Sequence, residues 1–241
     1  MTTIRFPNID YSYWLSEWDR SIGKLPTYSN KNMVEYIVFN GDISLCTNEI
    51  FTLIKSQDIS RPTVLKIIDL IYSWGGKSGR MFYASVNGKI SPRQSLDQKD
   101  SVFNKYLQGV MLAKKGDIRS IKKFCEIDGI GLSYASKHAY FWSLDSEKPL
   151  IIVDSKIAGS LGHFTIQSLE RVHKYEDIVF EFRNKSLKEF NEDNPNKTER
   201  ALFAFHNHYF LNDNSGWKNR LESKDFTEAS ILANKLFDNK A

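Results

Sequence analysis

The sequence predicts a mainly α-helical protein, and two observations support that prediction. Apolar residues recur three and four positions apart through most of the 241 residues, which is the spacing that places them on one face of a helix. Residues that favour helix starts precede several of these stretches. One short segment, residues 35–39, could instead form a strand before the turn Asn40-Gly41-Asp42. The length allows a sizeable core, in one two-lobed domain or two small domains.

The predicted helices follow one another along the chain. The first clear one begins at Ser60-Arg61-Pro62, because proline is favoured in the first turn of a helix. Asp100 and Asp117 can cap two further helices, which Gly116 separates, and Asp154 can cap another. The remaining predicted helices cover residues 132–144, 176–190, 198–210 and 227–237.

Composition excludes several classes of protein. Apolar residues make up 41% of the chain and charged residues 26%, both ordinary for a globular protein. The two cysteines, Cys46 and Cys125, cannot form a four-cysteine zinc site or iron–sulfur cluster, and they do not suggest a disulfide framework. No apolar run is long enough to span a membrane, and the N-terminus lacks the layout of a secretory signal. We therefore expect a cytoplasmic protein with no membrane association, no cofactor and no bound metal.

Positive charge is concentrated in one segment. The whole chain carries 33 basic and 29 acidic residues, but residues 61–123 alone carry 13 basic and 4 acidic ones. A local excess of this size suggests a polyanionic partner, although a lysine-rich solvated face is an equally good interpretation.

Two glycines lie between predicted helices in Ile127-Asp128-Gly129-Ile130-Gly131. Glycines there let the chain turn sharply and approach a ligand closely, while Ile130 would fill the angle between the helices. The free N–H groups of such a turn suit a phosphate oxygen, as in a helix–hairpin–helix element that holds one DNA strand. Alternatively, the pattern is only a tight turn. Basic residues precede it and would strengthen phosphate binding: Lys114, Lys115, Lys122 and Lys123.

An aspartate follows at a distance. Asp154 lies 23 positions after Gly131, and it ends the apolar run Leu150-Ile151-Ile152-Val153 and precedes a predicted helix. On its own this residue is explained as a helix N-cap. The glycine turn with its following helix is a common pattern, and so is an apolar segment that ends in aspartate. The two patterns in succession are a much more specific signal than either one alone.

These residues resemble the helix–hairpin–helix (HhH-GPD) DNA glycosylase superfamily, and most closely a bacterial branch with the 8-oxoguanine-glycosylase fold. The resemblance depends on Ile127–Gly131, Ala135 and Ile152–Ala158. It departs from the family at Asp128, where many relatives have proline, and in a slightly longer spacing to Asp154, which the loop 145–149 can absorb.

The resemblance implies a mainly α, two-lobed helical fold with a helix–hairpin–helix motif and a cleft between the lobes. Within one glycosylase-like unit over residues 1–241, we expect the segment 1–60 to pack with the C-terminal helices. We expect residues 61–162 to form the lobe that contains the hairpin, and residues 163–241 to form the C-terminal lobe.

The resemblance makes Asp154 the catalytic carboxylate. Breaking an N-glycosidic bond develops positive charge on the deoxyribose, and a nearby carboxylate stabilises it and can orient or deprotonate a water molecule. A helix N-terminus favours the ionised form that this role requires.

Family members that also cut the DNA backbone carry a lysine where this chain has Ser133. Serine cannot form the imine that this reaction needs, so we expect a monofunctional glycosylase with water as the nucleophile. Lys137 and Lys156 are possible substitutes for that lysine, but phosphate contact or solvation is the favoured interpretation of both. The expected backbone-binding residues are Gly129, Ile130, Gly131, Ser133, Lys123 and Lys137.

A glycosylase takes its target base out of the duplex into a pocket, which calls for aromatic faces and polar partners. The loop from Trp74 to Arg80, which includes Lys77, is the best candidate for a DNA-facing loop, and Phe203 and His206 are candidates for the pocket. For each aromatic, a place in the core is the competing interpretation.

The expected partner is double-stranded DNA with a modified base, bound by a monomer. The base can be a bulky one such as glucosylated hydroxymethylcytosine in phage DNA, or 8-oxoguanine. Two alternatives stay open: a helix–hairpin–helix module that binds DNA without catalysis, and a helical protein unrelated to DNA in which Asp154 is only a cap.

Overall fold

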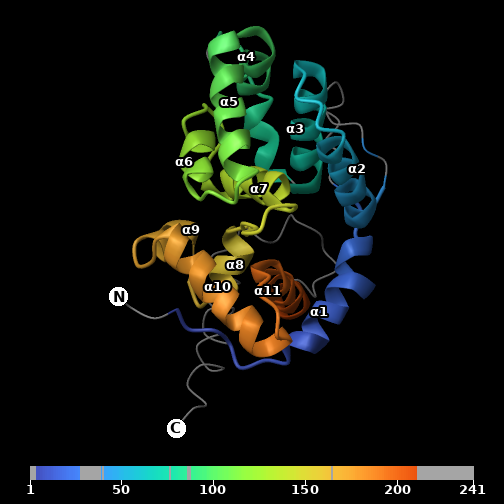
Figure 1. The fold of residues 1–241 in the computed structure, drawn as a ribbon, viewed down its shortest axis with the longest axis vertical. Coiled ribbons are helices and arrows are strands. Elements are labelled where there is room, and N and C mark those ends of the chain that lie inside the picture. Colours follow the sequence, from blue (N-terminus) through green and yellow to red (C-terminus); the bar gives the residue numbers. More distant parts are fainter. Residues whose placement is uncertain are drawn as a thin grey trace. The chain divides into compact units, whose positions relative to one another are not determined.

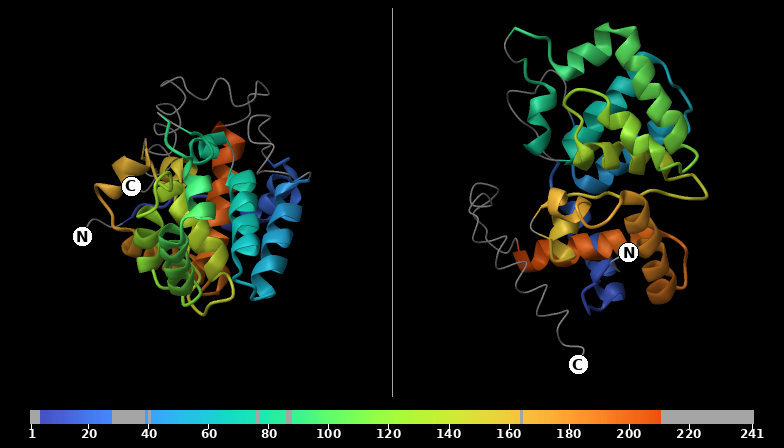
Figure 2. Two further views of the ribbon diagram at one scale, coloured as in Figure 1. Left: turned by 90° about the horizontal axis from the view of Figure 1, so that it is seen from above. Right: turned by 90° about the vertical axis from the view of Figure 1, so that its left-hand side faces the viewer.

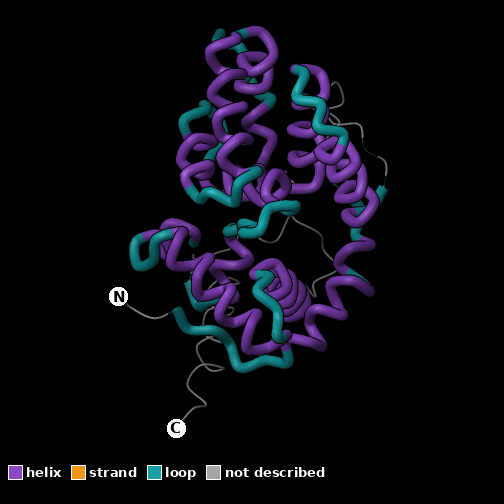
Figure 3. The backbone as a smooth tube through the Cα atoms, viewed as in Figure 1, coloured by secondary structure: helices purple, strands orange, loops and turns teal. Residues whose placement is uncertain are grey.

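The computed structural model describes residues 4–27, 39, 41–75, 77–85, 88–163 and 165–210. The chain is mainly helical, with 67% helix, as the sequence predicts (Figures 1 and 3). Among the described residues there is no strand, and Pro26 and Asp42 are joined by an isolated antiparallel bridge. Two expected elements, the possible strand over 35–39 and the helix over 227–237, fall almost wholly outside the described part.

The chain divides into two compact units. The first combines residues 1–20 with residues 151–241, and the second contains residues 21–150. These limits differ from those expected from the sequence, because residues 21–60 group with the unit that contains the glycine turn. Residues 151–162, and with them Asp154, group with the C-terminal helices.

The second unit is built around one buried helix. Helix α7 contacts α2, α3, α5 and α6, and every residue from Tyr134 to Ser143 is buried. The unit contains the short 3-10 helices η1 (Ile22–Lys24) and η3 (Lys77–Phe82), and the α-helices α2 (Ile43–Lys55), α3 (Arg61–Gly75), α4 (Pro92–Gln98), α5 (Asp100–Ala113), α6 (Arg119–Cys125) and α7 (Leu132–Ser143).

Helix starts in this unit follow their sequence signals with some shifts. Ser91 caps α4 through a reciprocal capping box with Gln94, and proline occupies the first turn. Asp100 is not a cap, because it lies inside the first turn of α5, where its negative charge is still favourable. Asp117 accepts a hydrogen bond from the backbone N–H of Arg119 at 2.9 Å, at the start of α6.

The first unit is built around α11 (Pro195–Phe210), which packs against α1 (Tyr11–Arg20), α8 (Ser155–Ser160) and α10 (Tyr175–Phe190) (Figure 2). A short helix, α9 (Ile166–Glu170), follows α8. The side chains of Trp14 and Trp18 bury one face of α1 against Phe205 and Phe203 through edge-to-face ring contacts. These two tryptophans are core residues of this unit.

None of the described helices combines the length and the apolar character needed to cross a bilayer.

Candidate nucleic-acid interface and catalytic carboxylate

The turn between α6 and α7 has a fixed shape, and Gly129 is the residue that requires it. Gly129 has φ +79°, a conformation that other residues rarely adopt, and a Cβ atom there would lie 2.7 Å from Cγ of Pro92. Ile127 and Ile130 are both buried, and the N–H of Ile130 donates to the carbonyl of Ile127 at 3.1 Å. The turn is thus anchored to the core by its apolar side chains.

Gly131 faces outward at the start of α7. Its φ of −82° and ψ of 172° are open to any residue, yet a Cβ atom there would have no neighbour within 4 Å. Its carbonyl accepts from the N–H groups of Tyr134 and Ala135, both at 2.9 Å, which begins the helix. The N–H groups of Leu132 and Ser133, in the first turn, have no partner within the helix. This outward end of a 12-residue helix suits an anionic oxygen.

Lys137 returns to the first turn of its own helix. Its residue is only 3% exposed, and Nζ donates to the carbonyl oxygen of Ser133 at 3.3 Å and to its hydroxyl at 3.2 Å. The same Nζ lies 5.4 Å from the centre of the Tyr134 ring. The structure thus brings together Ser133 and Lys137, two residues that the sequence analysis expects to contact the DNA backbone.

The other basic residues that precede the turn differ in how far their charge is available to a ligand. Lys123 forms an ion pair with Glu126, with Nζ 3.1 Å from Oε1, so part of its charge is neutralised locally. Nζ of Lys114 lies 5.5 Å from the centre of the Trp142 ring. Lys115 and Lys122 are exposed and remain available to a polyanion.

The loop expected to face DNA is only partly accessible. Trp74 is buried, donates from Nε1 to Oγ1 of Thr47 at 3.1 Å, and packs edge-to-face on Phe141. Its environment is that of a core residue, which is the alternative interpretation given above. Lys77 and Arg80 lie in η3, but their side chains fall outside the part that the structure describes.

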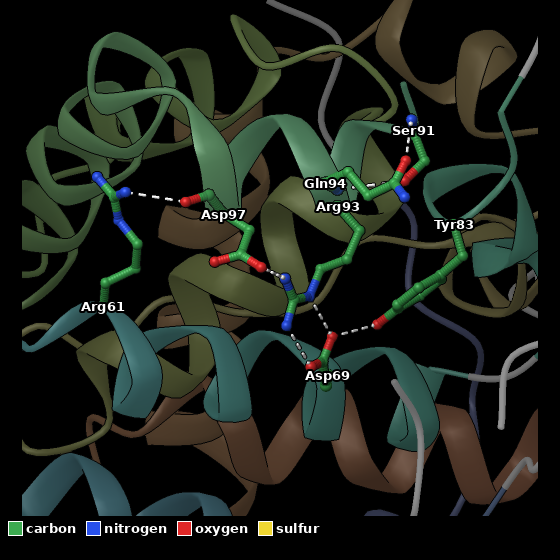
Figure 4. Close-up of polar contacts among 7 residues, drawn as sticks. All are labelled: Arg61, Asp69, Tyr83, Ser91, Arg93, Gln94 and Asp97. Atoms are coloured by element: carbon green, nitrogen blue, oxygen red, sulfur yellow. Dashed lines mark hydrogen bonds and ion pairs between the residues drawn. The ribbon is translucent and has the colours of Figure 1, made fainter. Parts of the chain in front are cut away.

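A buried polar network that the sequence did not predict follows this loop. Arg93 binds Asp69 with both ends of its guanidinium group, at 2.8 and 2.9 Å, and the hydroxyl of Tyr83 donates to Asp69 at 2.7 Å (Figure 4). Burial raises the pKa of Asp69, against the opposing effect of Arg93. Burial, together with the Asp69 carboxylate, also raises the pKa of Tyr83 well above its ordinary value. The network joins the residue after η3 and the start of α4 to α3.

Asp154 belongs to the first unit and caps α8. Its Oδ1 accepts from the N–H of Lys156 at 3.0 Å and from that of Ile157 at 3.2 Å. The residue is 8% exposed and follows a fully buried apolar run, 150–153. The cap that the sequence predicts is therefore present, and the carboxylate is also buried, with the positive end of a helix beside it.

Lys156, two residues later, reaches from α8 to α11. Its Nζ donates to Oδ1 of Asn207 at 2.9 Å and lies 4.0 Å from the centre of the Phe203 ring. His206 packs closely on α8, because a Cβ atom at Gly159 would lie 2.9 Å from its Nε2. Phe203 and His206, the two candidates for the pocket, are thus buried side chains that line the contact of α11 with α8.

No group of three or more histidine, cysteine or acidic side chains within the described ranges is placed to hold a metal ion. Cys46 is buried and Cys125 exposed, and neither forms a disulfide.

No protein-family model, no curated protein and no solved structure matches this chain.

Proposed function

We propose that this chain is a DNA glycosylase with the two-lobed helix–hairpin–helix fold, which removes a modified base and leaves an abasic site. The observation that carries the proposal is the α6–α7 turn, with its positive-φ glycine, its buried isoleucine and its open glycine at a helix N-terminus. A buried aspartate at the start of another helix accompanies that turn along the sequence.

The turn accounts for how DNA is held. Amide groups of Gly131, Leu132 and Ser133 can donate to a phosphate oxygen, and no methyl group at Gly131 obstructs its approach. Phosphate contacts carry no sequence information, so binding is independent of sequence. The positive segment 61–123 adds affinity through release of counterions from the DNA.

Asp154 accounts for the reaction. As the bond from C1′ to the base nitrogen breaks, its electron pair leaves with the base and positive charge develops on the sugar. The carboxylate stabilises that charge and orients a water molecule, whose oxygen bonds to C1′. The proton that the water loses ends on the departing base. The products are the free base and an abasic site.

Water is the nucleophile in this proposal because Ser133 cannot form an imine. The amine of Lys137 is close to Ser133, but it is held by the carbonyl and hydroxyl oxygens of that residue. Borohydride should therefore trap no covalent enzyme–DNA adduct. A trapped adduct would show that an amine attacks, and Lys137→Ala and Lys156→Ala would identify which one.

The direct test is to incubate the protein with duplexes that contain 8-oxoguanine, glucosylated hydroxymethylcytosine or only ordinary bases, and to detect abasic sites by alkaline cleavage. We expect release of one modified base, and Asp154→Asn should reduce it by at least about a hundredfold. DNA affinity should stay equal or rise, because a negative charge near the phosphates is removed.

A matched control separates chemistry from helix capping. Asp42 caps α2 in the same way, accepting from the N–H of Leu45 at 2.7 Å. Because asparagine is also a good N-cap, Asp42→Asn should change neither stability nor base release. If Asp154→Asn releases base at the parent rate, Asp154 is not the catalytic residue.

The second candidate is a DNA-binding module without catalysis. It is favoured by the two N-cap hydrogen bonds of Asp154, since capping alone explains an aspartate at that position. On this hypothesis the chain binds duplex DNA with strong salt dependence but releases no base from any of the duplexes.

A further inference from the structure

The segment that leads to Asp154 is buried although it is neither helix nor strand. Residues 150–153 are all buried, and no strand among the described residues lies beside them. Buried backbone N–H and C=O groups need hydrogen-bond partners, which a neighbouring strand or the turns of a helix normally supply. In this segment, side-chain hydroxyl groups supply some of these partners.

Tyr175, the first residue of α10, supplies two of them at once. Its hydroxyl donates to the carbonyl oxygen of Ile151 and accepts from the N–H of the same residue at 3.2 Å. One side chain therefore satisfies both backbone polar groups of Ile151. Burial raises the pKa of Tyr175 well above its ordinary value, so at neutral pH the hydroxyl keeps the hydrogen that it donates.

This contact lies where the chain enters the first unit. The second unit ends at Leu150, so Ile151 is the first residue of the stretch that carries Asp154. Three residues span at most about 11 Å, and the two residues between Ile151 and Asp154 are buried. Fixing Ile151 therefore restricts where the backbone of Asp154 can lie.

The chain after Asp154 is anchored separately. The hydroxyl of Ser160, the last residue of α8, donates to the carbonyl oxygen of Leu202 on α11 at 3.1 Å. Lys156 of α8 also reaches α11, through the hydrogen bond to Asn207 described above. Asp154 thus lies between a stretch that Tyr175 holds on α10 and a helix that is held on α11.

We propose that Tyr175 is a positioning residue, which holds Asp154 in place for the glycosylase reaction through its two hydrogen bonds to Ile151. The inference rests on the proposed function, because exact placement of the carboxylate matters only if it acts at C1′. A carboxylate stabilises developing charge best when it is already fixed where that charge appears, and a displacement of about 1 Å can cost about a hundredfold in rate. Tyr175 acts through the backbone and needs no contact with DNA.

The test compares Tyr175→Phe with the matched control Tyr11→Phe. Phenylalanine keeps the ring in the core and removes only the hydroxyl group. Tyr11 is also buried and lies in the first unit, and its hydroxyl donates to the carbonyl oxygen of Pro7 at 3.1 Å. Each variant therefore loses one buried hydroxyl from the same unit, but only Tyr175→Phe loses a contact with the segment before Asp154.

The first measurement is base release from the duplex on which the parent protein acts. In Tyr175→Phe, kcat should fall about tenfold with KM unchanged, because the carboxylate is misplaced in the transition state while DNA binding is untouched. In Tyr11→Phe, both constants should stay within about twofold of the parent values. Base release by Tyr175→Phe at the parent rate, or an equal loss in Tyr11→Phe, would overturn the positioning role.

The second measurement does not depend on catalysis. The amides of Lys156 and Ile157 donate to the Asp154 carboxylate, so their hydrogen exchange reports how firmly Asp154 is held. Exchange of both amides should be about tenfold faster in Tyr175→Phe than in the parent protein, and unchanged in Tyr11→Phe.

Different results separate the two proposals. Equal exchange in the two variants would refute the positioning role of Tyr175, whatever the catalytic result. If exchange accelerates only in Tyr175→Phe but the parent protein releases no base from any modified duplex, Tyr175 holds Asp154 and the glycosylase proposal fails. If Tyr175→Phe does not fold while Tyr11→Phe does, the hydroxyl is a requirement of folding, and the positioning role is again refuted.

Discussion

Gly129 and Gly131 show how two glycines in one turn have different physical roles. Gly129 needs a left-handed backbone and has Pro92 in the space that a methyl group would occupy. Gly131 needs neither, since its backbone is ordinary and its surroundings are open. Structural necessity explains the first glycine, whereas the backbone and packing set no such requirement at the second.

We expect Gly129→Ala to lower the free energy of unfolding by about 1–3 kcal/mol, because the strained φ and the clash with Pro92 add. Gly88→Ala is the control for the backbone alone, since Gly88 has φ +74° with no atom within 4 Å of a Cβ. Gly88→Ala should lower the free energy of unfolding by less than Gly129→Ala does. Urea unfolding measures both, and equal costs would show that the clash with Pro92 contributes nothing.

Gly131→Ala should lower the free energy of unfolding by only about 1 kcal/mol, because alanine is a poorer N-cap than glycine but nothing in the structure opposes the methyl group. Its affinity for duplex DNA should fall severalfold if a phosphate approaches this amide closely. A stable variant that binds DNA as tightly as the parent would place the DNA backbone elsewhere.

His138 is a buried histidine that has no place in the proposed reaction. Its Nδ1 and the Tyr106 hydroxyl are 2.9 Å apart, and that hydroxyl also accepts from Nε1 of Trp142 at 3.1 Å. Because this hydroxyl accepts from Trp142, its own hydrogen is available for donation to Nδ1 of His138. Burial, with a smaller effect from Lys137, lowers the pKa of His138 from 6.5 to about 3.

This lowered pKa predicts a loss of stability in acid. Between pH 6.5 and about 3 the unfolded chain protonates His138 while the folded chain does not, so protonation favours unfolding. The contribution is complete above pH 6.5 and falls by about 1.4 kcal/mol for each pH unit below it. Urea unfolding from pH 7 to 4, compared with His138→Phe, isolates this contribution. If the free energy of unfolding fell equally with pH in the parent and in His138→Phe, the prediction would be wrong.

At the scale of the helices, the sequence predicted where most helices lie but not which of their residues are buried. Proline and apolar spacing placed α3, and the periodicity over 176–190 and 198–210 placed α10 and α11 almost as observed. Helix α1 was not predicted, because its aromatic face is stabilised by α11, which is distant in the sequence. Periodicity could not tell whether Trp74 was core or surface, since both fit the same helical spacing.

The sequence predicted those parts of the candidate site in which a residue acts on its immediate neighbours in the chain. Glycines in the α6–α7 turn and an aspartate before α8 are visible in the sequence, because each acts within a few residues of itself. Contacts between distant segments, such as Lys156 with Asn207 or Asp69 with Arg93, have no local signal.

The pair Asp69–Arg93 joins α3 to α4 and should be the most sensitive polar contact of the second unit. Removing one partner leaves a buried charge without compensation, so Arg93→Met should cost about 3 kcal/mol or more. The double variant Asp69→Leu, Arg93→Met removes both charges and should recover much of that loss. Urea unfolding of the parent, Asp69→Leu, Arg93→Met and the double variant provides the comparison, and additive losses in the double variant would contradict the coupling.

For the whole molecule, the distribution of charge matters more than its total. A net charge of +4 is modest, but residues 61–123 alone carry 13 basic against 4 acidic residues, so the rest of the chain is slightly acidic. All of that basic segment lies in the same unit as the α6–α7 turn. Binding energy from phosphates should therefore come from one unit of the protein.

Salt dependence tests this asymmetry. Each phosphate contact contributes about 0.9 to the slope of log affinity against log salt concentration, so the double variant Lys115→Gln, Lys122→Gln should lower the slope by up to about 2. Both lysines are exposed and lie within this segment, close to the turn. The matched control is Lys174→Gln, Lys188→Gln, which removes two exposed lysines from the other unit and should leave the slope unchanged. Equal effects of the two pairs would mean that DNA is attracted by net charge alone, without preference for the unit that carries the glycine turn.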